Sequence, residues 1–154
     1  MPRRRVLTPR SGCPISLALE LLGDPWSLLV VRDLMFKGLN SFGDFLGAGE
    51  GIASNILADR LARLERAGIV LKRRDPLDRR RFVYRLTTKG IGLAPTLVEL
   101  VLWSDAHEET DAPRETIKAM CEHRAKFLRE VRAKWKADEG RCRSSSPRRA
   151  TTTR

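Results

Sequence analysis

Histidine, cysteine and acidic residues are scarce in this chain of 154 residues. It has two histidines and three cysteines, and its 19 acidic residues are outnumbered by 30 lysines and arginines. Cys13, Cys121 and Cys142 are too few and too scattered for a disulfide framework or a zinc site. His107 and His123 have neither a nucleophile–base pair nor metal-ligand spacing beside them. We therefore expect no enzyme active site, no metal and no cofactor, and thiols in a reducing compartment.

Long apolar runs are also absent from the sequence. No stretch approaches the roughly 20 apolar residues that a membrane-spanning helix needs. The first residues lack the apolar core and small-residue cleavage site of a secretory signal. These features predict a cytoplasmic protein with no membrane partner.

What the chain has in excess is positive charge. The formal net charge is +11 and the isoelectric point is near 10.6. Lysines and arginines near phosphates release condensed counterions, so a basic domain points first to a polyanion such as DNA. Because 42% of the residues are hydrophobic, the chain can also build a folded core.

Composition changes along the chain predict four segments. The first is rich in arginine, the second carries the main apolar pattern, the third reads as one more helix, and the fourth is rich in Ser, Thr and Arg. We expect a flexible basic arm (1–12), the main domain (13–110), an additional C-terminal helix (111–138) and a disordered basic tail (139–154).

Start and stop signals divide the main domain into short elements. Pro14 suits the first position of a helix that Gly23 ends, and Asp24-Pro25 then starts an apolar helix from Trp26 to about Phe36. Ser41 with Asp44 fits a capping box that opens a short helix. The clearest helix runs from Ile52 to about Ala67, with Gly68 placed for a C-terminal cap.

A hairpin and further helices follow. The β-branched segments 69–71 and 82–84 flank a turn-rich stretch, which predicts a β-hairpin with a long loop. Helices are expected after Thr87-Thr88 and again from Pro113. This order is that of a mainly α fold with a small β-hairpin (α+β), a winged helix-turn-helix with flanking dimerisation helices.

In such a fold the helix after the turn enters the major groove of DNA. The leucines at 57, 61 and 64 would face inward, leaving a polar outer face on helix 52–67. The Asn side chain can pair with adenine, the Ser hydroxyl can donate to or accept from a base, and the Asp carboxylate can accept from the cytosine amino group. Because Asp59 would also face phosphates, it should either read a base or be neutralised by Arg60 or Arg63. The alternative is an ordinary amphipathic helix with a solvated outer face. The candidate DNA contacts on this helix and at the start of the preceding one are Ser41, Ser54, Asn55, Ala58, Asp59, Arg60 and Arg63.

The hairpin adds a concentration of basic residues. Residues 72–85 contain seven basic groups and two acids. We expect Arg79, Arg80 and Arg81 at the tip of the turn, where a guanidinium can enter a narrow minor groove of A·T-rich DNA. A run of charged residues is usually only part of the solvent-exposed surface. This one directly follows the candidate recognition helix, which favours a role in DNA binding.

Several sequence motifs resemble those of one known family. Cys13-Pro14-Ile15 with the segment 19–29, Ser41 to Leu46, Ile52 to Leu61, and Tyr84-Arg85-Leu86-Thr87 together resemble HxlR-type bacterial transcription regulators over about residues 13–107. The resemblance implies a homodimeric regulator, a repressor by expectation, on an inverted-repeat operator in double-stranded DNA. Apolar stripes before residue 23 and after residue 91, which exceed what a small winged domain can bury alone, agree with a dimer. The alternative is that these helices pack only within the chain.

Two further expectations come from resemblance. The wing is similar to that of MarR-type regulators, which implies that Asp78 positions Arg80 for the minor groove. Some HxlR-type regulators detect electrophiles or oxidants with a cysteine at the position of Cys13, so the resemblance implies a sensing thiol, or else a reversibly bound small-molecule effector. Cys13 at a helix start could equally be a small structural residue. The alternative function is a sequence-neutral architectural DNA-binding protein, for which the basic arm and tail would be the active parts.

Overall fold

A computed structural model describes residues 10–144, with side chains described for residues 10–138. Most of the expected basic arm and residues 145–154 of the expected tail therefore lie outside the described residues. The elements in chain order are α1 (Pro14–Leu22), α2 (Ser27–Arg32), the π-helical turn η1 (Asp33–Lys37), α3 (Phe42–Leu46), α4 (Ser54–Arg66), β1 (Val70–Arg74), β2 (Phe82–Leu86), α5 (Thr88–Ile91), α6 (Ala94–His107), α7 (Arg114–Glu122) and α8 (Arg124–Ser144).

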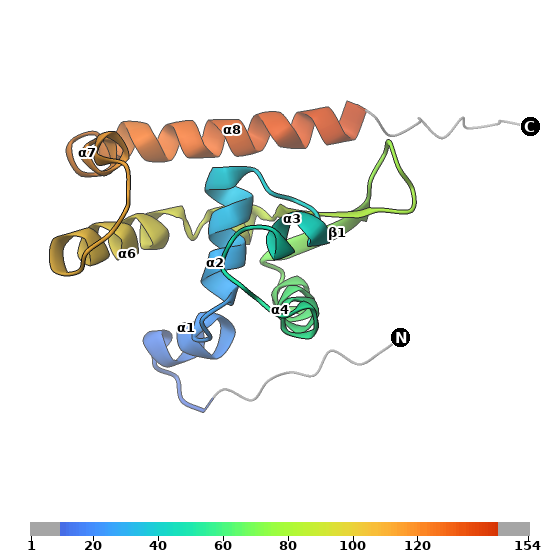
Figure 1. The fold of residues 1–154 in the computed structure, drawn as a ribbon, viewed down its shortest axis with the longest axis horizontal. Coiled ribbons are helices and arrows are strands. Elements are labelled where there is room, and N and C mark those ends of the chain that lie inside the picture. The colour runs from blue at the N-terminus through green and yellow to red at the C-terminus, as the bar shows by residue number, and fades with distance from the viewer. Residues whose placement is uncertain (1–9, 145–154) are drawn as a thin grey trace, which may run out of the picture.

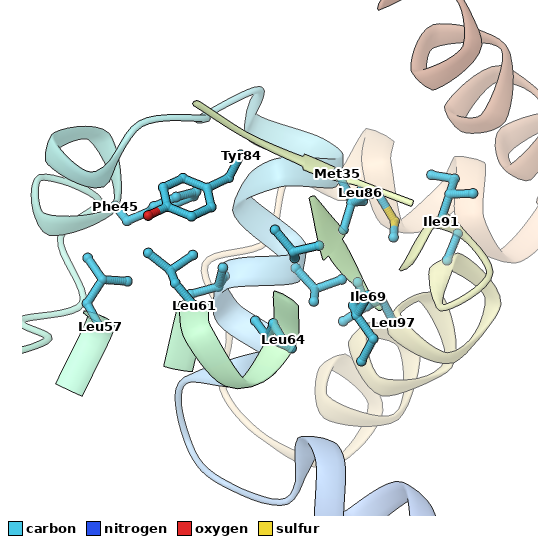
Figure 2. Close-up of a cluster of buried hydrophobic side chains, with 14 of the residues drawn as sticks. Met35, Phe45, Leu57, Leu61, Leu64, Ile69, Tyr84, Leu86, Ile91 and Leu97 are labelled. Carbon is cyan, nitrogen blue, oxygen red and sulfur yellow. The ribbon is translucent and has the colours of Figure 1, made fainter. Parts of the chain in front are cut away.

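The core lies between helices α2, α4 and α6 and the hairpin. Leu57, Leu61 and Leu64 of α4 are at most 2% exposed, which confirms the inward face expected from their spacing. Figure 2 shows these leucines in a continuous apolar cluster, with Phe45 and Leu57 at one end and Leu86 and Ile91 at the other. The main domain is thus the expected winged helix-turn-helix.

The hairpin is antiparallel and longer than expected. Its register pairs Val70 with Leu86 and Arg74 with Phe82. The expected strands, 69–71 and 82–84, were limited to the apolar residues. In the structure, backbone pairing extends the first strand through exposed basic residues to Arg74. An isolated bridge between Ser41 and Val83, with the Tyr84 N–H donating to the Asn40 carbonyl at 2.7 Å, ties the hairpin to the start of α3.

Helix α5 begins where the second strand meets the end of α4. The Thr87 hydroxyl donates to the Gly68 carbonyl at 2.6 Å and accepts from the Gly90 N–H at 3.1 Å. A Cβ on Gly90 would lie 2.2 Å from the Ile69 carbonyl oxygen, so only glycine allows this close approach.

The expected helix from Trp26 to Phe36 forms, but its last turn is π-helical. Gly38 follows with φ of 70°, and its N–H donates to the Asp33 carbonyl five residues earlier. Asp33 is 3% exposed and pairs with Arg32 at 2.7 Å and with Lys37 at 3.5 Å. These pairs supply partners for a carboxylate that would otherwise be buried alone.

The expected single helix from Pro113 to Asp138 is wrong. The chain breaks at His123, with φ of −126° and ψ of 33°, so that α7 packs on α6 while α8 turns back across the molecule. Figure 1 shows α8 as a long helix crossing one side of the fold towards the hairpin. Met120 is buried, and Leu128, Val131 and Trp135 pack against the core.

The expected start of a structureless tail at residue 139 is also wrong, because α8 continues to Ser144. The expected boundary rested on the loss of an apolar period near Gly140, which instead lies inside α8. A helix-interior glycine costs only about 1 kcal/mol relative to alanine, and a helix that is already anchored can tolerate that cost.

Candidate nucleic-acid interface

Helix α3 begins with the capping box that the sequence predicts. The Ser41 hydroxyl accepts from the Asp44 N–H at 3.2 Å, and the Asp44 carboxylate accepts from the Ser41 N–H at 2.9 Å. The hydrogen bonds with Ser41, helped by that from Asn40 and by the charge of Arg81, hold the pKa of Asp44 below its ordinary value despite some burial. Ser41 is only 6% exposed, so its side chain is occupied in starting α3.

An arginine of α2 holds the turn between α3 and α4. Arg32 contacts Glu50 in that turn at 2.8 Å and Asp33 on its own helix at 2.7 Å. Although partial burial opposes the charged form, the hydrogen bonds that Arg32 donates to Glu50 and Asp33 raise the pKa of Arg32 above its ordinary value. The turn is therefore fixed to α2, which orients the start of α4.

The outer face of α4 is short-chained and polar near its N-terminus. Ser54, Asn55, Ala58 and Asp59 are all exposed there, as expected. Such small side chains let the helix backbone approach a groove closely, and the Ser and Asn groups can reach base edges.

Two arginines expected on this face lie elsewhere. The Arg60 guanidinium is 3.5 Å from Asp24 and 3.7 Å from Asp59, and its side chain is 19% exposed. Arg63 donates to the Glu20 carbonyl of α1 at 3.0 Å. Arg60 thus joins α4 to the segment between α1 and α2, and Arg63 joins α4 to α1 itself.

Asp24 provides the carboxylate that pairs with Arg60 in this contact. Its carboxylate accepts from the N–H groups of Trp26 and Ser27, each at 2.9 Å, and from the Ser27 hydroxyl. Burial opposes its ionisation, but the hydrogen bonds from Ser27 and Trp26 and the charge of Arg60 hold the pKa of Asp24 below its ordinary value. Asp24 therefore accepts from the first backbone N–H groups at the start of α2 and pairs with Arg60.

The hairpin loop, residues 75–81, is shaped by two aspartates. Asp75 accepts from the Leu77 N–H at 2.9 Å, and Asp78 accepts from the Arg80 N–H at 3.0 Å. Both are Asx-type turns, in which a carboxylate bonds the backbone two residues on. Asp78 therefore acts on the backbone of Arg80, and the salt bridges of residues 10–138 include none that holds the Arg79 or Arg80 guanidinium.

Sequence reasoning missed part of the basic surface of the hairpin. The Lys72 ammonium lies 4.3 Å and the Arg74 guanidinium 4.7 Å from the centre of the Phe82 ring, so the three form one exposed cation–aromatic stack. The spacing of Lys72 and Arg74 by two residues on a strand was the signal for a shared face. Leu77, at the loop tip, is 96% exposed.

Cys13 is exposed at the N-cap of α1, and its side chain does not cap the helix. Within residues 10–138, no group of three or more His, Cys, Asp or Glu side chains could hold a metal ion. Among the described helices, none is by itself long and apolar enough to cross a membrane. The pair formed by α1 and residues 27–37 reaches that length and composition only together, and is bent by 81°.

This geometry can be compared with known proteins. The family model described as HxlR-like helix-turn-helix matches residues 21–112. A helix-turn-helix transcriptional regulator of Synechocystis is 38% identical over 88 residues, which is 57% of this chain and 64% of that protein. The chain thus covers less than two thirds of this relative's length.

Solved structures are similar over the same region. PA1607, described as a candidate transcription factor, has a TM-score of 0.60 and 36% identity, covering 68% of this chain and 71% of that one. Reduced YodB, a transcriptional regulator of Bacillus subtilis, has a TM-score of 0.53 and 30% identity, covering 63% of this chain and 95% of that one. The chain therefore belongs to the HxlR-like helix-turn-helix family, a class of DNA-binding transcriptional regulators rather than of enzymes.

Proposed function

We propose that this protein is a homodimeric transcriptional repressor that binds an inverted-repeat operator in double-stranded DNA and acts in the cytoplasm, where a bacterial chromosome lies. The observation that carries the proposal is the exposed polar face at the start of α4, beside a hairpin whose Arg79 and Arg80 guanidiniums form no salt bridge in the described residues.

Helix α4 is proposed to read the major groove through Asn55, Ser54 and Asp59, with Ala58 allowing close approach. Ser41 supports this role indirectly, since its hydroxyl caps α3. Arg60 and Arg63 hold α4 against Asp24 and Glu20, so their contribution is to the angle of the helix.

The hairpin is proposed to enter the minor groove with Arg80 and to bind phosphates with Arg79 and Arg81. The Asx turn at Asp78 supports this role because it fixes the backbone from which the Arg80 side chain extends.

Exposed apolar side chains on α1 and α6 support a homodimer. Ile15 and Leu19 of α1 are 71% and 57% exposed, and Leu100 and Trp103 of α6 are 42% and 59% exposed. Both helices lie at the end of the molecule away from the hairpin loop (Figure 1), so pairing through them would leave two α4 helices free for DNA. Exposed large apolar residues at several positions of two helices support an interaction surface.

Cys13 is proposed as a thiol that responds to oxidants or electrophiles. It is exposed at the start of α1, next to the proposed dimer surface. YodB, which is 33% identical over 94 residues, has been solved in diamide-treated and quinone-bound forms. Diamide treatment should lower the operator affinity of the native protein and leave that of Cys13→Ser unchanged. Equal responses would assign Cys13 a structural role.

The proposed function is tested by selecting bound sequences from a random DNA pool. An inverted repeat should emerge, with half-sites about 10 base pairs apart and at least about 10³-fold preference over unrelated DNA. Enrichment of no sequence would support the architectural alternative. Repression is tested separately, because transcription in vitro from a promoter that overlaps the selected site should fall as protein is added.

A further inference from the structure

A cavity of about 350 Å³ lies between the end of η1, strand β2 and helix α8. One side is formed by Met35 and Leu39, another by Leu86 of the strand, and α8 closes it with Trp135 and Lys134. Cavities of about 300–1,000 Å³ are the usual size for small-molecule sites. The space is therefore large enough for a compact organic molecule.

Helix α8, which forms one wall, lies outside the region that matches the family model, residues 21–112. It is fastened to the strand by two contacts. The Trp135 indole donates to the Leu86 carbonyl at 2.9 Å, and the Arg85 guanidinium donates to the Trp135 carbonyl at 3.5 Å. The wall is thus held by specific contacts from a helix that lies outside the matched region.

The lining combines an apolar body with a cationic edge. The apolar and aromatic surface comes from Met35, Leu39, Leu86, Ile91 and Trp135. Positive charge comes from Arg85 and Lys134. Asp138 and Asn40 complete the polar lining. With two cations and one carboxylate, the polar edge has a net charge of +1, which favours a ligand with one negative charge.

We propose that this cavity is a binding site for a small monoanionic organic acid with an aromatic or bulky apolar body. The apolar body packs against Trp135, Leu39 and Met35, and the acid group lies between Arg85 and Lys134. A guanidinium suits this task because its planar fork can hold both oxygens of a carboxylate.

The site adjoins the elements that carry the DNA surface. Arg85 and Leu86 belong to β2 of the hairpin, and Asn40 accepts a hydrogen bond from Tyr84 just before α3 begins. The proposal goes beyond DNA binding and does not depend on it, because occupancy of the cavity can be measured with no DNA present.

The test is calorimetric titration of the full chain with 2-naphthoate and with its neutral analogue 2-naphthamide. We expect one 2-naphthoate per chain and at least about tenfold weaker binding of the amide. Arg85→Met and Lys134→Met should each weaken 2-naphthoate binding at least about tenfold while changing amide binding less than about threefold. Lys136→Met, on the same helix but outside the cavity lining, is the matched control and should bind both as the native chain does.

Several results would overturn the proposal. These are no binding of 2-naphthoate at millimolar concentration, equal affinity for the acid and the amide, or the same affinity loss in Lys136→Met as in Lys134→Met. Because Lys134 is exposed, its variant tests the charge even where Arg85→Met disturbs the packing of α8. A failed titration would leave the operator selection unaffected, so the two proposals fail separately.

Discussion

The arginines proposed for the DNA surface fall into two groups, those with partners inside the fold and those in the hairpin loop, and the sequence alone does not distinguish them. Arg60 and Arg63 of α4 contact Asp24 and the Glu20 carbonyl inside the fold. Arg79 and Arg80 extend from the hairpin loop, and no salt bridge of the described side chains involves them. Since a guanidinium already paired at a half-buried site gains less from a phosphate, we expect the loop arginines to contribute more to DNA affinity.

For the loop, Arg80→Ala should weaken operator binding by about 1–3 kcal/mol and reduce sequence preference at the bases it contacts. Arg79→Ala should weaken binding to all sequences similarly and reduce the salt dependence of affinity by about one counterion. Fluorescence anisotropy at several salt concentrations measures both effects. Lys118→Ala, an exposed cation on α7, is the control. Equal losses from both loop variants on every sequence would indicate a plain charge patch.

At the contact between Asp24 and Arg60 of α4, Asp24→Asn should lower the free energy of unfolding by about 1–2 kcal/mol at neutral pH. The substitution weakens the hydrogen bonds at the start of α2 and leaves Arg60 with Asp59 as its remaining ion-pair partner. The pKa of Asp24 is depressed in the folded protein, so its stabilisation is present above the unfolded pKa, about 3.9, and is lost as the pH falls through the folded value.

Urea unfolding at neutral and acid pH measures this effect. The gap between native and variant proteins should close as the pH drops below about 4. A difference in unfolding free energy that persists unchanged at low pH would show that the carboxylate charge of Asp24 does not stabilise the folded protein.

At the scale of elements, α8 acts as a support for the hairpin. Trp135→Phe keeps an aromatic ring against the core but removes the hydrogen bond to the Leu86 carbonyl. We expect a loss of about 0.5–1.5 kcal/mol in the free energy of unfolding and faster amide exchange in β1 and β2. Lys136→Ala, on the exposed side of α8, is the control. Unchanged exchange in the hairpin would show that α8 only covers the core.

Helices α1 and α6 carry the apolar surface proposed for the dimer. Ile15→Glu should convert the protein to a monomer of 17.4 kDa, as measured by light scattering, because it places a charge at the proposed interface. Ile15 is 71% exposed in the single chain, so the variant should still fold. Leu77→Glu, at the exposed hairpin tip, is the matched control and should remain a dimer. A dimeric Ile15→Glu protein would place the interface elsewhere.

At the scale of the whole molecule, symmetry links the dimer to the operator. Two copies of α4 held by a rigid interface should require half-sites on the same face of the DNA. Inserting 5 base pairs between the half-sites turns one of them to the opposite face, and affinity should fall at least about tenfold. Gel-shift titrations with native and lengthened operators test this. Unchanged affinity would mean that each chain binds its half-site alone.

The sequence predicted most of the fold, and it predicted the exposed polar face of α4 that is proposed here to bind DNA. The leucine spacing of α4, the capping box at Ser41 and the two β segments are local patterns, and each led to the observed element. The exposed face of α4 and the basic loop followed from the same patterns. Local signals suffice here because caps and apolar periods act within a few residues.

Other features depended on contacts between residues far apart in the sequence. The break at His123 and the extension of α8 to Ser144 arise because α7 packs on α6 while α8 packs on the strand and η1. No residue near position 123 gives a stop signal as strong as proline. An apolar stripe on one side of a helix predicts that this side is buried, but it does not predict which element covers it. The apolar pattern of residues 113–138 was therefore compatible with one long helix or with two shorter ones.

Patterns within the sequence are enough to predict a basic, mainly helical domain with a recognition helix and a hairpin wing. Long-range packing sets which cations of the proposed DNA surface are paired inside the fold, and it places α8 beside β2, where it lines a cavity. Charge and apolar periodicity are properties of short segments, so they follow directly from the amino-acid sequence. The partner of a long side chain such as Arg60 depends on which segment packs beside it, and that is set only when the elements assemble.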